Sequence, residues 1–597
     1  MDAGDKQEER VVPTVAPRPE PVLQDNARHV AAEDEPLEPE LWYVVGMRVY
    51  EMRDSSTLGV GQHEGREGDE IEQVAAPATK YERRREQDKE VAIGREREPD
   101  ERHGNGEREH EDRPGEQSVA GVERLPRWAP ALAVGGAALL AFAVRLPFWR
   151  APLTADEGGY AEVARLWERG AHLYRGAWVD RPQGLLLSFR ALLALGGGSP
   201  ESIRLLAALV SIALVLATMA LATRLCGRIE GAAAGLLLAS FGASPFIESF
   251  TLAGELLASL PAVLSLLAFV AYLRQRRPSW LVLAGLLTGC AVMIKQSAFD
   301  AGLAAVAFLL IRERRRGIPP AAVLLLSALA PVALGAATAP HLGDWWNAVV
   351  SYRAQGDSLL TGSPGHRLDL LLSSLPAAAI GLGLLGLLAA VGWRTAPLLA
   401  RLWFGAALVG VAGGGNFHPH YYLQLAPPLS LLAGVGVWRL FAQPHRALAA
   451  CCGAAAAATV AVTAPLWFAS GAAQARTVWP HDPHLVDDGQ RAAFVRAHTT
   501  PGQQILVVWA AADIYELADR PPAEPFLWYR NVQALPQARA AVRRALIERK
   551  PSLVVEVQPP EAIDRSGATS RILHEDYRLV ARVDGTPMLE PRPAPVG

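Results

Sequence analysis

The chain has 597 residues, of which half are hydrophobic and 20 % charged, and this composition excludes a wholly disordered protein. Residues 1–120 hold 31 acidic and 17 basic side chains, a net charge of −14, whereas the rest of the chain has a net charge of +11. An acidic segment joined to a long, charge-poor body argues against a soluble multidomain enzyme and predicts a polytopic membrane protein. Basic residues are scattered between apolar segments, which argues against nucleic acid binding.

Residues 1–125 mix Glu, Arg, Gly, Pro and Gln without any period. Their one apolar patch, residues 41–50, is too short to cross a hydrocarbon core about 30 Å thick. Segments of low hydrophobicity and high charge cannot bury enough apolar surface to fold. We therefore expect residues 1–125 to form a disordered charged arm in the cytoplasm.

Apolar runs of membrane-spanning character follow this arm, and they predict a transmembrane domain over residues 126–472. The fold class expected from them is an all-α polytopic bundle of about eleven transmembrane helices. The run that contains Asp300 is short, which predicts a tilted, re-entrant or internally packed segment. The runs cover residues 128–144, 205–223, 231–247, 256–273, 279–294, 297–311, 317–340, 370–393, 395–415, 421–438 and 447–472.

The loops between these runs predict the orientation. With the arm in the cytoplasm, the loops on its side contain thirteen Arg, whereas the short segments 248–255, 295–296, 341–369 and 416–420 on the other side contain three basic residues. Short cytoplasmic loops are enriched in Lys and Arg. We therefore expect a multi-pass protein with a cytoplasmic N-terminus, and the Ala-, Gly- and Arg-rich composition favours a bacterial plasma membrane.

Residues 473–597 have globular character and follow the last run on the outer side. Ile505–Trp509 and Leu553–Val557 are typical of short strands, and Pro536–Lys550 of a helix with one apolar face. A small extracytoplasmic α/β domain is expected. It contains three clusters that could line a ligand groove or a domain interface, namely Trp479–Pro480, Pro521–Pro522 and Trp528–Tyr529.

The loop after the first run, TADEGGYAEVARLWERGAHLYRGAWVDRPQGLLL at residues 154–187, concentrates polar side chains. Asp156 and Glu157 begin a predicted helix with Tyr160 and Trp167 on its apolar face. Adjacent carboxylates at a membrane surface can supply a general base and a neighbour that orients it. Acids are also favoured at a solvated helix N-terminus by the helix dipole, so spacing alone leaves both interpretations open.

The loop also contains, in order, the elements DE..YAE.AR, G.W and P.G of a known motif; the residues concerned are Asp156, Glu157, Tyr160, Ala161, Glu162, Ala164, Arg165, Gly176, Trp178 and Pro182, with Arg181 directly before the proline. In this it resembles the GT-C membrane glycosyltransferases, especially the protein O-mannosyltransferase and aminoarabinose lipid A transferase branch. The resemblance implies a GT-C-like fold over about residues 128–440. It also implies inverting transfer of a sugar from a polyprenyl phosphate to an acceptor hydroxyl at the outer face, with Asp156 as the base.

The same resemblance implies roles for two cations and a further acid. Arg181 and Lys295 would hold the departing phosphate, although Lys295, at the end of an apolar run, is also interpreted as a side chain that snorkels to the interface. Arg181 stands where many members of the family have Lys. Glu255 and its neighbour Glu248 flank the turn between the third and fourth runs, either as orienting acids or as solvated loop residues.

The segment NFHPHYYLQLAPPL at residues 416–428 is the last candidate. His420 and Tyr421, with His418 and Tyr422, are predicted to bind phosphate or sugar hydroxyls, while an interfacial aromatic belt is the alternative for the tyrosines. The two histidines are separated by a proline and have no clear third ligand nearby. No metal site is therefore predicted, a divalent cation is the disfavoured alternative, and no other cofactor is expected.

Two other classes of protein compete with a glycosyltransferase. A transporter would place polar residues near the bilayer midplane, whereas the acids here gather at the outer boundary. A non-catalytic envelope assembly component would not require the Asp-Glu loop. The expected partners are membrane lipid, a polyprenyl-phosphate-linked sugar and a protein, lipid or polysaccharide acceptor; the sequence specifies neither the sugar nor the acceptor.

Overall fold

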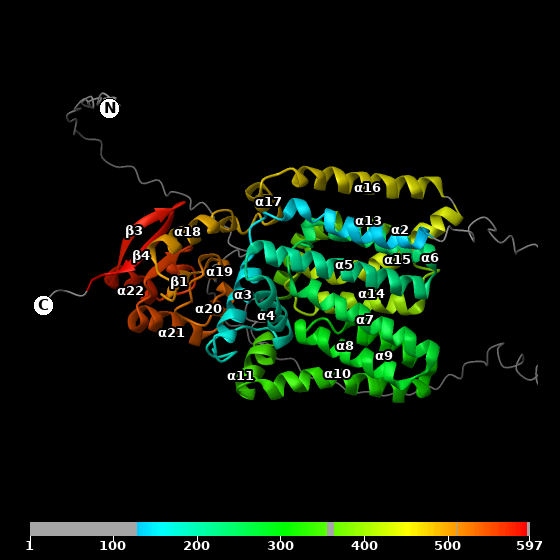
Figure 1. Cartoon of the computed structure of the whole chain (residues 1–597), viewed down its shortest axis with the longest axis horizontal. Coiled ribbons are helices and arrows are strands. Elements are labelled where there is room, and N and C mark those ends of the chain that lie inside the picture. The colour runs from blue at the N-terminus through cyan, green and yellow to red at the C-terminus, as the bar shows by residue number, and fades with distance from the viewer. Residues whose placement is uncertain (1–127, 355–362, 444, 510, 594–597) are drawn as a thin grey trace, which may run out of the picture. The chain divides into compact units, whose positions relative to one another are not determined.

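A computed structural model describes residues 128–354, 363–443, 445–509 and 511–593, all within one structural unit, Val49–Gly597. The predicted arm, residues 1–125, lies outside the described residues. Figure 1 shows long helices, shorter helices and a small sheet.

Each of the eleven apolar runs coincides with a helix, and the all-α bundle is confirmed. Among the described residues, seven segments are long and apolar enough to cross a membrane, with α9 and α10 counted as the single segment Asp300–Thr338. Helices α6, α8 and α14 are shorter than the about 20 residues of a full span. The helices are α2 (Ala129–Ala143), α5 (Pro200–Leu225), α6 (Arg228–Ser240), α7 (Gly254–Gln275), α8 (Pro278–Ile294), α9 (Asp300–Glu313), α10 (Ile318–Thr338), α13 (Pro364–Gly392), α14 (Leu398–Ala412), α15 (Ala426–Ala442) and α16 (Arg446–Trp467).

The bundle shows the burial pattern expected of a protein in lipid. Helix α10 exposes Leu326 and Leu334 by 68 % and 64 %, and only 17 % of the apolar window of Asp300–Thr338 is buried. Apolar side chains lose nothing by facing hydrocarbon, whereas on a soluble protein they would form a large aggregation-prone patch. The chain is a multi-pass membrane protein.

Shorter elements occupy the connections between the long helices. The loop after α2 forms α3 (Ala155–Glu168) and α4 (Gln183–Gly196), and α3 contacts both α4 and α19, a helix of the C-terminal region (Figure 1). The other short elements are η1 (Leu146–Phe148), η2 (Phe241–Ala243), η3 (Pro245–Ile247), η4 (Arg314–Gly317), α11 (Leu342–Trp346), η5 (Asn347–Ser351) and η6 (Pro419–Leu425).

The C-terminal region contains a four-stranded sheet of order β1-β2-β4-β3, in which β1 and β2 are parallel and the other pairs antiparallel. The predicted strands are present as β1 and β2, and the predicted helix as α21 with the following turn η8. The elements are α17 (Gly471–Val478), η7 (Pro483–Val486), α18 (Asp488–His498), β1 (Ile505–Val508), α19 (Asp513–Ala518), α20 (Tyr529–Ala534), α21 (Pro536–Arg544), η8 (Ala545–Arg549), β2 (Leu553–Glu556), η9 (Pro560–Ala562), α22 (Ala568–Asp576), β3 (Tyr577–Val583) and β4 (Thr586–Pro591).

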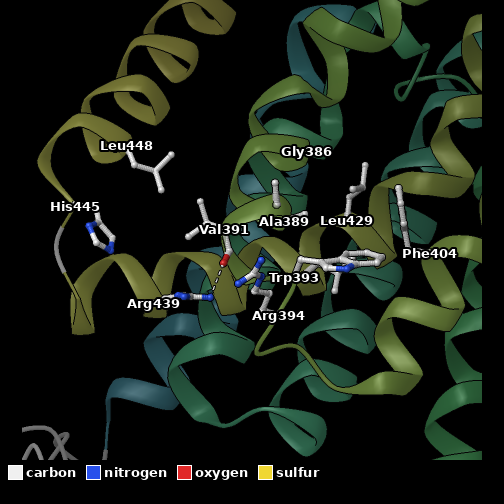
Figure 2. A pocket seen from close by; sticks show the side chains of 12 residues that line it. Gly386, Ala389, Val391, Trp393, Arg394, Phe404, Leu429, Arg439, His445 and Leu448 are labelled. Carbon is white, nitrogen blue, oxygen red and sulfur yellow. Dashed lines mark hydrogen bonds between the residues drawn. The ribbon is translucent and has the colours of Figure 1, made fainter. Parts of the chain in front are cut away.

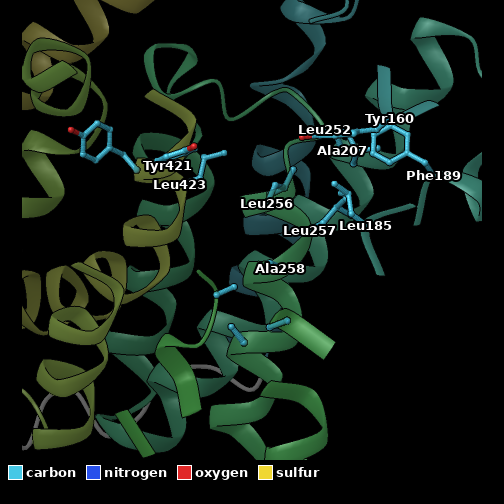
Figure 3. Close-up of a cluster of buried hydrophobic side chains, with 14 of the residues drawn as sticks. Tyr160, Leu185, Phe189, Ala207, Leu252, Leu256, Leu257, Ala258, Tyr421 and Leu423 are labelled. Atoms are coloured by element: carbon cyan, nitrogen blue, oxygen red, sulfur yellow. The ribbon is translucent and has the colours of Figure 1, made fainter. Parts of the chain in front are cut away.

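One hydrophobic cluster extends through the bundle, α3 and the sheet. Figure 3 shows part of it, where Tyr160 of α3 lies beside Phe189 of α4 and near Leu185 and Leu252. The rings of Tyr160 and Phe189 meet edge to face at 5.8 Å. Because this core is continuous, α3 is held from both sides. The domain division at residue 473 stays a prediction.

Candidate active site

Helix α3 carries the Asp-Glu pair, and its start is fixed by local chemistry. The Oγ1 of Thr154 accepts the N–H of Glu157 at 3.2 Å, and a carboxylate oxygen of Glu157 accepts the N–H of Thr154 at 3.2 Å. This reciprocal capping box satisfies two of the otherwise unpaired donors at a helix N-terminus. It leaves Asp156 in the first turn of the helix, with its side chain outside the cap.

Glu157 faces the bundle and is 1 % exposed. It forms a buried ion pair with Arg204 of α5, and the same carboxylate oxygen accepts the N–H of Leu252 at 2.8 Å. Arg204 in turn donates to the carbonyl of Pro152 at 2.8 Å. Both oxygens of Glu157 are therefore engaged, one by the cap and one by the bundle.

Asp156 faces the C-terminal region and is half-buried. Its Oδ1 accepts the indole N–H of Trp528 at 3.0 Å, and its Oδ2 accepts the hydroxyl of Tyr160 at 3.3 Å. The two aromatic rings contact each other with centroids 5.3 Å apart. Asp156 is thus oriented by two neutral donors and, unlike Glu157, forms no ion pair with any described residue.

Gly158 and Gly159 explain how the C-terminal region approaches α3 so closely. A Cβ at Gly158 would lie 2.4 Å from Cα of Asp513, and one at Gly159 would lie 2.5 Å from the ring of Trp528. Any side chain at these positions would force the two parts of the chain to separate. The Gly-Gly pair after Asp-Glu is therefore needed for the hydrogen bond between Trp528 and Asp156.

Arg181 lies in the connection between α3 and α4 and is 9 % exposed. It pairs with Asp180 at 3.1 Å, and Asp180 also binds Arg353 at 2.5 Å. Burial by itself lowers the pKa of Arg181. The negative charge of Asp180 and, to a smaller extent, that of Asp156 oppose this effect, and the pKa is raised well above its usual value. Arg181 therefore remains cationic close to the carboxylate of Asp156.

A second polar cluster joins three predicted site residues from different helices. Lys295, at the end of α8, forms a buried ion pair with Glu255 in the first turn of α7. Its Nζ also lies 3.9 Å from the ring centroid of Tyr421 in η6. A cation over an aromatic face is stabilised by the ring quadrupole. Lys295 is thus held inside the protein, and it does not snorkel away from the bundle.

His420 connects the two acids that flank the turn before α7. Its Nδ1 lies 3.3 Å from Glu248, and its Nε2 lies 3.9 Å from Glu255. The ring stacks on His418 with centroids 5.5 Å apart, and both rings contact Tyr421 edge to face. The imidazole of His420 therefore lies between two carboxylates, and its buried Nδ1 forms no hydrogen bond with any described residue.

The charged residues that influence His418 come both from the cluster around Asp156 and from the cluster around Lys295. Burial lowers the pKa of His418 well below its usual value, and Arg530, His420, Lys295 and Arg181 lower it further. The neutral imidazole of His418 consequently lies near the cations Arg530, Lys295 and Arg181. Arg530 is positioned by a 2.7 Å hydrogen bond to the amide oxygen of Asn416.

Six of the seven predicted site residues therefore meet in one region: Asp156, Arg181, Glu255, Lys295, His420 and Tyr421. Glu157 belongs to the same helix as Asp156, but its side chain points into the bundle. Within the described ranges no group of three His, Cys, Asp or Glu side chains is arranged to hold a metal ion. The residue roles stay predictions.

Sequence reasoning missed Trp528 as a partner of Asp156, Arg204 as the partner of Glu157, and Asp180 as the acid shared by two arginines. The sequence leaves the Trp528–Tyr529 cluster open between a groove and a domain interface, and Trp528 lies at a contact between the two parts of the chain. Thr154 and Glu157 carry a readable signal, because Ser or Thr followed three residues later by Glu is typical of a capping box.

Comparison with known proteins supports the resemblance seen in the loop. Residues 180–338 match the family model for dolichyl-phosphate-mannose-protein mannosyltransferase. The chain is also similar to the crystal structure of ArnT from Cupriavidus metallidurans bound to undecaprenyl phosphate, with 18 % identity, a TM-score of 0.50, and coverage of 77 % of this chain and 97 % of that one. The apo structure of that ArnT gives 16 % identity, a TM-score of 0.51 and the same coverage.

This is the GT-C-like fold. The chain therefore has a fold similar to that of ArnT, and residues 180–338 are similar to protein mannosyltransferases, in agreement with the resemblance carried by the loop. No curated protein matches the sequence significantly.

Proposed function

We propose that this GT-C enzyme transfers a sugar from a polyprenyl phosphate to an acceptor hydroxyl at the outer face of the membrane, with inversion and with Asp156 as the general base. The observation that carries the proposal is the position of Asp156, a half-buried carboxylate oriented by Trp528 and Tyr160 and close to the cation of Arg181. The undecaprenyl phosphate bound to ArnT in its crystal structure supports a lipid phosphate donor.

The proposed roles of these residues follow from their charges. Arg181 and Lys295 are buried cations that can compensate the phosphate as it leaves, because a preorganised charge in a dehydrated site stabilises a developing anion without reorganisation. Asp156 removes the proton of the acceptor hydroxyl as the new glycosidic bond forms and the bond to the phosphate breaks. Holding donor and acceptor together contributes the rest of the acceleration.

The remaining acids have supporting roles in this proposal. Glu255 is paired with Lys295 and adjoins His420, so it positions the phosphate-binding cation. Glu157 is engaged by Arg204 and by the cap, and it positions α3 and hence Asp156. The predicted orientation, with a cytoplasmic N-terminus and these residues on the outer side, is part of the proposal.

The substitution Asp156→Asn tests the base. It keeps the size and hydrogen-bonding capacity of the side chain and removes its basicity, so transfer should slow by about 10² to 10⁴. Undecaprenyl phosphate binding, followed by native mass spectrometry, should persist. Transfer is measured as the glycan product in membranes of cells that lack the gene and carry each variant.

The matched control is Glu168→Gln, which removes an exposed carboxylate from the same helix. It should leave both readouts unchanged. Parental transfer by the Asn variant would remove Asp156 from the mechanism. Normal glycans in cells without any copy of the gene, together with no binding of the lipid phosphate, would favour a non-catalytic assembly component.

A further inference from the structure

A second candidate binding site lies at the other end of the bundle. A groove of about 640 Å³ is lined by α13, α14, α15 and the residues around the start of α16. Helix α15 begins beside η6, which contains Tyr421 of the candidate active site, and it ends at Ala442 just beyond the groove residue Arg439. The groove is therefore separate from the site that contains Asp156.

The groove exists because one face of α13 carries small residues. Gly386, Ala389 and Ala390 line it, at the i, i+3, i+4 spacing of a single helix face, and Trp393 lines it directly after the end of α13. A Cβ added at Gly386 would meet no atom within 4 Å. Figure 2 shows Gly386 and Ala389 on the middle helix of the view, with Leu429 on its right and Leu448 on its left.

The mouth of this apolar groove is basic. Arg394, Arg439 and His445 line it, and none of the described residues in the lining is acidic. The guanidinium of Arg439 donates to the carbonyl of Val391 at 3.3 Å, which holds it near Arg394, as Figure 2 shows. Trp393 is 39 % exposed beside them, as is common for an indole at the level of lipid headgroups.

The length of the groove indicates the kind of lipid that fits. Arg439 and Leu429 are ten residues apart on α15, which corresponds to about 15 Å along the helix axis. This is about half of a hydrocarbon core roughly 30 Å thick, the depth that an acyl chain of one leaflet reaches. A basic mouth with an apolar groove one leaflet deep is complementary to an anionic lipid headgroup and its chain.

We propose that this groove binds an anionic glycerophospholipid from the leaflet opposite the candidate active site. Its phosphate contacts Arg394 and Arg439, and one acyl chain lies along Gly386 and Ala389. The proposal does not depend on the transfer reaction, because it rests on residues that contact neither Asp156 nor Lys295.

Native mass spectrometry of the full chain tests this proposal. The protein is exchanged into detergent with equal amounts of dioleoyl phosphatidylglycerol, dioleoyl phosphatidylcholine and undecaprenyl phosphate, and the retained lipid is counted. Phosphatidylglycerol should be retained at least tenfold over phosphatidylcholine. Arg394→Gln combined with Arg439→Gln should remove this preference.

A second variant separates groove binding from general attraction to charge. Gly386→Leu fills the groove where the added atoms have space, so it should lower phosphatidylglycerol retention at least tenfold without altering the basic mouth. Gly383→Leu is the matched control, because Gly383 lies on the same helix, also has open space at its Cβ, and is outside the groove lining.

Equal retention of the two phospholipids would overturn the proposal. A Gly386→Leu variant that retains as much phosphatidylglycerol as its control would also overturn it. The same holds if the double variant Arg394→Gln, Arg439→Gln loses undecaprenyl phosphate but still retains phosphatidylglycerol.

Discussion

The two sides of α3 hold buried carboxylates in different ways. On the bundle side, Glu157 has one cation, Arg204, and hydrogen-bond donors for both oxygens. On the side of the C-terminal region, Glu162 and Glu516 lie together and share Arg165, which also pairs with Asp519 at 2.8 Å. One oxygen of Glu162 and one of Glu516 have no hydrogen-bond partner among the described residues.

The consequence appears in the protonation of these acids. Burial, together with the charge of Glu516, raises the pKa of Glu162 to about 8, and burial raises the pKa of Glu516 to about 7. Acids that are buried and compete for one cation take up protons near neutral pH, because burial disfavours their charged form. The ion pair on the bundle side therefore anchors α3, whereas the other side is a contact whose strength depends on pH.

Glu157→Gln should have the largest effect on stability. It leaves Arg204 charged and buried without its partner, which typically costs about 3–5 kcal/mol. We expect a large fall in apparent Tm in nanodiscs together with loss of transfer. Glu168→Gln provides the control on the exposed end of α3, and an unchanged Tm for Glu157→Gln would show that the bundle side is not an anchor.

Gly158→Ala should have an intermediate effect, because its Cβ would lie 2.4 Å from the backbone of Asp513. Overpacking of this kind costs about 1–3 kcal/mol, and limited proteolysis should cleave the C-terminal region more readily. Gly136→Ala on α2 is the control, since a Cβ there meets nothing within 4 Å. Equal protease resistance in the two variants would contradict the close contact.

The pH dependence of stability should distinguish the two sides of α3. Because the pKa of Glu162 is raised on folding, the folded protein holds more protons than the unfolded chain from about pH 5 to 8, and stability falls as pH rises through this window. We expect Glu162→Gln to lessen that fall by on the order of 1–2 kcal/mol. Apparent Tm measured from pH 5.5 to 8.5 checks this, and a parental pH profile in Glu162→Gln would refute it.

Trp528→Phe should have the smallest effect. It removes the donor to Asp156 but keeps an aromatic ring against Tyr160, and the net value of one hydrogen bond, about 0.5–1.5 kcal/mol, predicts a twofold to tenfold slower transfer. Trp479→Phe is the control, because the buried indole N–H of Trp479 has no hydrogen-bond partner among the described residues. Equal rates in the two variants would show that Trp528 does not position the base.

Much of the bundle could be predicted from the sequence because lipid imposes a simple rule. A helix that crosses hydrocarbon must be apolar over most of its length, so each apolar run marks a helix. The β3–β4 hairpin also carried a readable signal that the prediction missed. Asp584 and Gly585 separate the two strands, both have positive φ, and Asp-Gly is a preferred pair for such a tight turn.

The site was predictable only in part. The motif singled out Asp156, and the apolar surroundings singled out Lys295, but their partners come from remote parts of the chain. No local pattern relates Glu157 to Arg204 on α5, or Lys295 to Glu255 on α7. Such pairs arise from helix packing, which spacing along the sequence does not encode.

The hydrogen bond between Trp528 and Asp156 joins residues 372 positions apart. The seven candidate spans among the described residues are complete by Trp467, so their insertion into the membrane can be finished while the carboxylate still lacks its indole donor. The contact can form only after residues 468–528 have been made and have folded back onto α3. Synthesis from the N-terminus therefore imposes an order in which membrane integration comes first and the proposed catalytic geometry is assembled late.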